Sequence, residues 1–420
     1  MKAIYLPQAI ALYMAAVLGS GILFLTGATA AVAGPASLVA WIIIIGASLP
    51  IAYTFALLAK WYPDAGGVST FVQRAFHREL GGMVGWMYFF CATSGQMIVS
   101  LTGAYYLASA FDLSSLYVMV FAILLLVIAG TANIVGLQVS GKLAIVISTM
   151  LLLLLLLAIL VAAPYMQWRH FQPFAPSGWQ EIGTALTMMF WLFFGWEAIC
   201  NLANRFAHPQ RDIVLSTMIS LCIVSALALS LSVVTIGTKT YGEEGQNLSP
   251  IGVIISDYVG LNAGVVTGIM AFMICLGTVN AFVASLAHLG YALSRENKFP
   301  KYFFHKHPST DQPVRVIGLV MVLAILGVCL CGIYHISYDA LLFIPNSLGL
   351  TVYVLSMAAG MKLLPSKTLP WWIAALALTL CLACLPFFGQ YMVVPLSVAV
   401  VYACYRLKRG GKKYEHIDSP

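Results

Sequence analysis

Charged residues are scarce in this chain of 420 residues: they make up 8% of it, whereas 61% of it is hydrophobic. A water-soluble domain usually carries about 25% charged residues, so this chain has too little polar surface to keep a folded domain dissolved. Apolar runs of about 20 residues, the length that crosses the hydrocarbon core of a bilayer, recur along almost the whole sequence. The composition therefore predicts an all-α membrane protein that crosses the bilayer many times.

Sequence signatures of cofactors, metals and catalysis are also missing. There is no GxxxxGK[ST] loop for nucleotide phosphates, and the nine cysteines lack a loop framework for disulfides and histidine partners for zinc. No Ser/His pair and no pair of aspartates falls at membrane depth. The first apolar run continues into a full span without a cleavage site, so we expect no cleavable signal peptide. We predict that the protein is not an enzyme and binds no metal and no cofactor.

Apolar runs between polar or Pro/Gly-rich breaks predict twelve transmembrane helices in a single domain, residues 1–406. The helices are expected near residues 7–33, 37–61, 81–110, 115–134, 141–163, 182–206, 213–238, 261–292, 314–334, 338–361, 369–388 and 390–406. Residues 407–420 form a basic tail.

Lysine and arginine residues predict the orientation of these helices. If the N-terminus is cytoplasmic, all 21 of them except Arg169 and Lys239 fall on the cytoplasmic side, as the positive-inside rule requires. Both termini are therefore expected in the cytoplasm. The same asymmetry accounts for the net charge of +7 without nucleic acid as a partner, and the basic tail can rest on anionic lipid headgroups.

Two predicted helices contain glycine-rich breaks: Gly19-Ser20-Gly21 in the first, and Gly195 near the middle of the sixth. Irregular backbone at membrane depth is tolerated only where it is buried in protein or lines a cavity. Secondary transporters place such breaks at corresponding positions of two repeats. We therefore predict discontinuous helices one and six in a five-plus-five inverted repeat. The repeats would cover residues 7–163 and 182–361, with two further helices within residues 369–406.

A broken helix exposes backbone groups that suit an amino acid. Amide N–H groups at the start of a half-helix suit a carboxylate, and carbonyl groups at the end of another suit an ammonium group. The alternative is that Gly19 and Gly21 only let another helix pack closely. The second break favours the binding-site interpretation.

Four segments resemble sequences of the APC (amino acid-polyamine-organocation) superfamily of amino-acid transporters. They are GSGILFLTG at residues 19–27, YPDAGGVSTFVQRAF at 62–76, FFGWEAICNLANRFAHPQRD at 193–212 and YALSRENKFPKYF at 291–303. The chain looks most like the bacterial branch that exports neutral, hydrophobic amino acids such as methionine and the branched-chain set. The resemblance implies a LeuT-like fold.

The resemblance also implies roles for residues at the two breaks. Amides of Ser20, Gly21 and Ile22, following Gly19, would hold the substrate carboxylate. Carbonyl groups around Phe190, Trp191 and Phe193, next to Gly195, would receive its amino group. Aromatic side chains would line or gate the side-chain pocket, namely Phe190, Phe194 and Trp196, although aromatic rings in a membrane helix more often serve packing.

Glu197 is the most informative titratable residue, because carboxyl groups at helix-centre depth are costly and usually functional. Matching glutamates in similar transporters couple protonation to gating, so we expect a proton-coupling role; the alternative is a structural carboxyl that ties two helices together. Residues 144–156 lack the lysine that many similar transporters use in place of sodium, so H⁺ is the expected coupling ion and Na⁺ is not excluded. His288, with an unperturbed pKa of about 6.5, stands where similar proteins have arginine, and we expect it to bridge helices.

Secondary site candidates are polar residues in the third, eighth and tenth predicted helices, which either face a cavity or hydrogen-bond between helices. They are Gln96, Asn280, Asn346 and Ser347. Together these observations predict a transporter of neutral, hydrophobic amino acids in a bacterial-type plasma membrane, exporting them by proton exchange as a monomer or homodimer. The alternatives are an uptake system for amino acids or amines, and a membrane sensor without transport.

Overall fold

The computed structural model describes residues 4–63, 67–137, 141–197, 200, 203 and 206–414. Its α-helices are α1 (Leu6–Leu18), α2 (Gly21–Ala33), α3 (Ser37–Trp61), α4 (Gly67–Ala75), α5 (Arg78–Ala110), α6 (Ser115–Ile134), α7 (Gly141–Ala162), α8 (Glu181–Met189), α9 (Pro209–Gly237), α10 (Glu244–Leu248), α11 (Pro250–Val259), α12 (Leu261–Arg295), α13 (Val314–Tyr334), α14 (Tyr338–Leu363), α15 (Leu369–Cys384) and α16 (Val393–Tyr414). Short 3₁₀ helices are η1 (Gly34–Ala36), η2 (Ala163–Tyr165), η3 (Trp168–Phe171), η4 (Phe190–Phe193), η6 (Lys301–Phe303) and η7 (Leu385–Met392).

Within the described part of the chain, nine helical segments are long and apolar enough to cross a membrane. They are Gly21–Trp61, Arg78–Ala110, Ser115–Ile134, Ile145–Tyr165, Pro209–Gly237, Leu261–Arg295, Val314–Tyr334, Ala340–Leu363 and Leu369–Lys408. The all-α, multi-pass architecture is therefore confirmed. The count differs from twelve because the first and last of these segments each run through two helices, and α8, with nine residues, is too short to cross alone.

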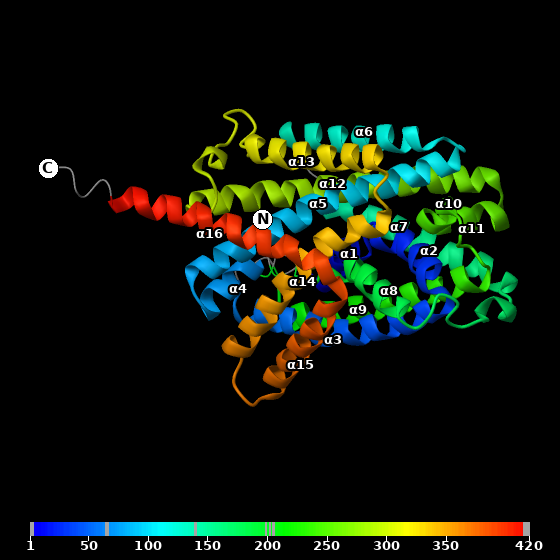
Figure 1. The fold of residues 1–420 in the computed structure, drawn as a ribbon, viewed down its shortest axis with the longest axis horizontal. Coiled ribbons are helices and arrows are strands. Elements are labelled where there is room, and N and C mark those ends of the chain that lie inside the picture. Colours follow the sequence, from blue (N-terminus) through cyan, green and yellow to red (C-terminus); the bar gives the residue numbers. More distant parts are fainter. Residues whose placement is uncertain are drawn as a thin grey trace.

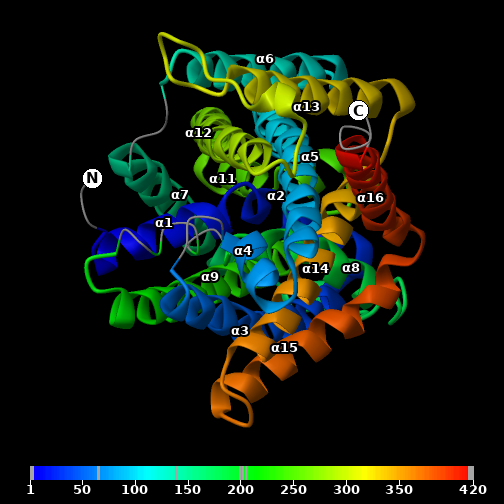
Figure 2. The same ribbon diagram turned by 90° about the vertical axis from the view of Figure 1, so that its left-hand side faces the viewer.

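The helices pack in two groups around the centre of the molecule. In Figure 1, α5, α6, α12 and α13 lie side by side, and α5 packs against α6 and α12 while α6 packs against α13. In Figure 2 this group forms one side of the molecule, and α15 lies at the opposite edge. The second group joins α3 to α8 and α9, and α1 to α9. Helix α14 packs against both α5 and α3, so it lies between the two groups.

The predicted break in the first span is confirmed. Helix α1 ends at Leu18, Gly19 has a positive φ of 31°, and α2 starts at Gly21. A glycine adopts positive φ without the steric cost that a Cβ atom brings. The chain therefore interrupts its helix here and resumes two residues later.

The sixth predicted span ends its regular helix earlier than expected. Helix α8 ends at Met189, η4 ends at Phe193, Phe194 is extended (φ −75°, ψ 132°) and Gly195 has a φ of 134°. Apart from positions 200 and 203, residues 198–205 lie outside the described residues, as do residues 64–66 of another resembling segment.

The C-terminal helix differs from the prediction in length. Helix α16 continues to Tyr414, whereas the sequence predicted a helix to residue 406 and a tail from 407. The extension is rich in lysine and arginine, which are strong helix formers. These charged residues bring the apolar stretch to an end, but the helix continues through them.

Candidate substrate site

The two backbone breaks lie against each other. A Cβ atom added at Gly21 would lie 3.2 Å from Cδ1 of Trp191, 3.2 Å from Cδ1 of Leu192 and 3.3 Å from the Leu192 Cα atom. The first turn of α2 thus touches η4 directly, and a side chain at position 21 would require Trp191 or Leu192 to shift. Helix termini leave backbone N–H and C=O groups without intrahelical partners, so donors of α2 and acceptors of η4 come together in one place.

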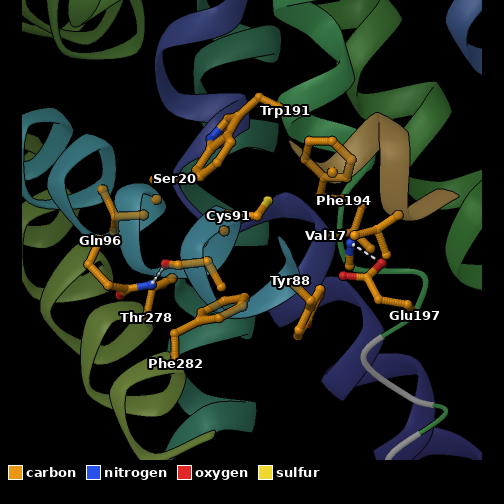
Figure 3. Close-up of a pocket in the computed structure, with 18 of the residues that line it drawn as sticks. Val17, Ser20, Tyr88, Cys91, Gln96, Trp191, Phe194, Glu197, Thr278 and Phe282 are labelled. Carbon is orange, nitrogen blue, oxygen red and sulfur yellow. Dashed lines mark hydrogen bonds between the residues drawn. The ribbon is translucent and has the colours of Figure 1, made fainter. Parts of the chain in front are cut away.

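A cavity of about 680 Å³, its open mouth included, lies at this meeting point (Figure 3). Its lining comes from five parts of the chain: the α1–α2 break, one face of α5, the residues from η4 to Glu197, α12 and α14. Helix α12 contributes Thr278 and Phe282, which are one turn apart. The site is therefore formed by both helix groups rather than by either one.

Most of the lining is apolar or aromatic. Valines 17, 99 and 352 line it together with rings from α5, α12 and α14, and polar side chains are few. Gln96 is buried, and its Nε2 donates a 2.7 Å hydrogen bond to the Ala92 carbonyl of its own helix. Mostly apolar walls with a few placed polar groups are typical of sites that orient small ligands.

Glu197 lies in the wall of the cavity and is 4% exposed. Its Oε2 accepts a hydrogen bond of 3.0 Å from the Gly195 amide and one of 2.5 Å from the Tyr353 hydroxyl. The Tyr88 side chain also interacts with this carboxyl group. The carboxyl thus joins the segment after η4 to α14 and to α5, which places it at the boundary between the two helix groups.

The indole ring of Trp191 spans the space between α2 and α5. Its Cδ1 atom lies next to Gly21, as given above, and its Cη2 atom would lie 2.7 Å from a Cβ atom at Gly95. Figure 3 shows the ring beside Ser20, on the far side of the cavity from Tyr88. The absence of side chains at Gly21 and Gly95 therefore leaves room for the two ends of the indole ring.

The structure brings half of the sixteen predicted site residues together at the cavity. Those that line it are Gly19, Ser20, Gly21, Gln96, Trp191, Phe194, Gly195 and Glu197. Ile22 and Phe190 are buried behind it, and Trp196 is fully buried with its ring 5.7 Å from that of Tyr13. The side chain of Phe193 lies outside the described residues.

Polar candidates on other helices have different positions. Asn346 donates a 2.7 Å hydrogen bond from α14 to the Thr187 carbonyl of α8, and Asn280 donates one of 3.3 Å to the Leu137 carbonyl after α6. Both therefore bond between elements, while Ser347 donates to Ile344 in its own helix. His288 lies on an exposed face of α12, and its expected role in bridging helices stays a prediction.

Sequence reasoning missed several lining residues. Those on α5 are Tyr88, Cys91, Ala92, Gly95 and Val99. With Gln96 they recur every three or four residues, which is one face of a helix, so helical periodicity starting from Gln96 would have found them. Gly349, Val352 and Tyr353 on α14 carry the same spacing. The residue types of these three positions do not distinguish them from residues that only pack in the protein core.

Comparison with known proteins establishes the family. The sequence profile of the amino acid permease family matches residues 4–404. The chain is 33% identical to the uncharacterized amino acid permease YecA of Bacillus subtilis strain 168, covering 98% of this chain and 97% of that protein. It is 29% identical to the L-methionine/branched-chain amino acid exporter YjeH of Escherichia coli K12, over 86% of each chain. It is 26% identical to the branched-chain amino acid permease BcaP of B. subtilis strain 168, over 71% of this chain and 68% of that protein.

The chain therefore belongs to the amino acid permease family, within the APC superfamily. This confirms the resemblance of its motifs and the prediction of a membrane transporter rather than an enzyme. Amino-acid transport across a bacterial plasma membrane is the activity that this membership supports.

Proposed function

We propose that this protein is a secondary transporter that exports neutral, hydrophobic amino acids in exchange for protons. The observation that carries the proposal is the contact between Gly21 and η4, which puts the start of one half-helix and the end of another at a single cavity. Support for the substrate class also comes from similarity to a methionine and branched-chain amino acid exporter.

The charges of the helix termini match a zwitterion. The N-terminus of α2 carries partial positive charge and free amides, which favour a carboxylate. The carbonyl end of η4 carries the opposite partial charge and favours an ammonium group. The apolar walls from α5, α12 and α14 then surround the amino-acid side chain, so neutral, hydrophobic substrates fit better than charged ones.

Transport requires the site to open alternately to the two sides of the membrane. We propose twelve transmembrane helices in a LeuT-like five-plus-five repeat, with both termini in the cytoplasm. The breaks at Gly19 and Gly195 would then occupy corresponding positions of the two repeats. Relative movement of the two helix groups, which share the cavity, would expose the substrate to one side and then to the other.

Glu197 is the group to which we assign proton coupling. It is the acidic residue that lines the cavity, and its hydrogen bonds join the segment after η4 to α14. Proton uptake neutralises the carboxylate and turns one of its oxygens into a donor as well as an acceptor, so it changes both the charge and the hydrogen-bonding capacity of this part of the cavity wall. A sodium-coupled mechanism is the competing hypothesis for the same site.

Counterflow in proteoliposomes tests the proposal. Vesicles containing the purified protein and unlabelled leucine or methionine should accumulate labelled amino acid from outside. An imposed proton gradient should change this flux, whereas a sodium gradient should not. A bare diamine such as putrescine, which several more distant relatives are named for, has no carboxylate for the α2 amides and should not exchange. Absence of exchange with every amino acid would refute the proposal.

A further inference from the structure

The aromatic ring of Phe194 forms part of the cavity wall, and three neighbours determine where it lies. Its centroid is 5.2 Å from that of Tyr353 in an edge-to-face contact and 5.8 Å from that of Phe190. On a third side it lies against Gly349 of α14, where an added Cβ atom would overlap the ring and lie 2.5 Å from Cε1. The ring also borders the cavity, which is the side that remains open to it.

Gly349 lies beside the Phe194 ring and in the wall of the cavity. It lies inside the long helix α14, where glycine is a poor helix former, and it is not among the residues with positive φ. Its missing side chain makes the space that the Phe194 ring occupies. Tyr353 and Phe190 are each 2% exposed, and close-packed interiors do not yield space readily. A side chain at position 349 would therefore push the ring toward the cavity.

We infer that Gly349 determines which amino-acid side chains the site accepts, because it lets the Phe194 ring withdraw into the wall. This inference rests on the proposed function and adds to it a residue that selects substrate size. The withdrawn ring leaves space for side chains as long as those of leucine and methionine. A side chain at position 349 would meet the Phe194 ring and not the backbone of α2 or η4, so binding of the carboxylate and amino groups should depend less on position 349 than binding of the side chain does.

The test compares KM values for alanine, valine, leucine and methionine in counterflow with purified Gly349→Ala protein. We expect the KM for leucine and methionine to rise at least about tenfold relative to that for alanine, because differences of one methylene in an apolar pocket change discrimination by about 10- to 200-fold. Gly46→Ala in α3 and Gly318→Ala in α13 are matched controls, since nothing lies within 4 Å of a Cβ atom at either position. Both controls should retain the wild-type preference.

A second variant distinguishes selectivity from misfolding. In the double variant Gly349→Ala/Phe194→Leu the smaller side chain removes the overlap, so the preference for leucine and methionine should return. Phe194→Leu alone should extend transport to larger side chains such as phenylalanine. An equal rise in KM for every amino acid in Gly349→Ala, not reversed in the double variant, would overturn the inference while leaving transport itself established. If the wild-type protein exchanges no amino acid, the proposed function fails and this inference falls with it.

Discussion

The Tyr353 hydroxyl donates a hydrogen bond of 2.5 Å to Oε2 of Glu197, which joins α14 to the segment after η4. The Gly195 amide donates to the same oxygen. Gly195, at the break in the sixth span, and Tyr353, in helix α14, therefore share one acceptor. Because α14 packs against α3 and α5, this carboxyl group is bonded to a helix that contacts both helix groups.

Replacing Glu197 with glutamine should remove the pH dependence of transport. The amide oxygen still accepts hydrogen bonds from Tyr353 and Gly195, but the side chain no longer titrates. We expect leucine counterflow to persist within about threefold of wild type, and proton-driven accumulation to disappear. Transport rates measured from pH 5 to pH 8 would check this. A Glu197→Gln protein with full, pH-dependent transport would remove the residue from the mechanism.

Tyr353→Phe removes one hydroxyl and keeps the ring that packs against Phe55 and Phe194. The charged carboxylate then loses a donor that favours it, so the midpoint of the pH dependence of transport should move to higher pH. Leucine KM should change little, because the cavity keeps its shape. The same pH series on the variant measures the shift. A changed KM with an unchanged pH midpoint would instead indicate a packing role for Tyr353.

Gly21→Leu should abolish substrate binding while the protein still inserts into the membrane. The new side chain would overlap Trp191 and Leu192 at the place where α2 meets η4. Binding of labelled leucine to detergent-purified protein measures the effect, and elution as a single species on size exclusion confirms folding. Gly46→Leu serves as the control, because it adds the same side chain in open space. Retained binding in the Gly21 variant would mean that the glycine serves packing alone.

Gly82→Ala should loosen the C-terminal helix from the rest of the protein. A Cβ atom at this position of α5 would overlap the hydroxyl group of Tyr402 in α16, and Arg406 of the same helix pairs with Glu79 at 2.6 Å. Overpacking of this kind costs about 1–3 kcal/mol, so thermal unfolding should occur at lower temperature. Tyr402→Phe in the same background should restore part of the loss, and Gly318→Ala should cause none.

Local patterns in the sequence were enough to predict most of the long apolar helices and the first break, but not the short helix α4 or the early end of α8. Apolar length determines which segments cross a bilayer, because backbone polar groups in lipid must be satisfied within the segment itself. Gly19 and Gly21 indicated the interruption between α1 and α2 because glycine is rare without cause in a helix interior. The predicted limits of α5, α6 and α13 lie within three residues of the observed ones.

Which residues line the cavity depends on how the helices pack, and local sequence patterns do not predict this packing. Phe190 and Trp196 look like Phe194 in sequence, yet Phe194 borders the cavity and the other two are buried behind it. Which ring faces the cavity depends on the extended conformation of Phe194 and on the glycine of α14 beside it. Likewise, polarity alone did not separate Gln96 from Asn280 and Asn346.

The sequence by itself thus determined that this chain is a membrane protein with an interrupted first helix, because hydrophobic length and glycine content are properties of single segments. Only the tertiary structure decided that the two breaks touch, that Tyr353 meets Glu197, and that Gly349 lies under Phe194. Each of these contacts joins residues more than 150 positions apart. Such contacts depend on how helices pack in three dimensions, and residue type or spacing along one segment does not specify them.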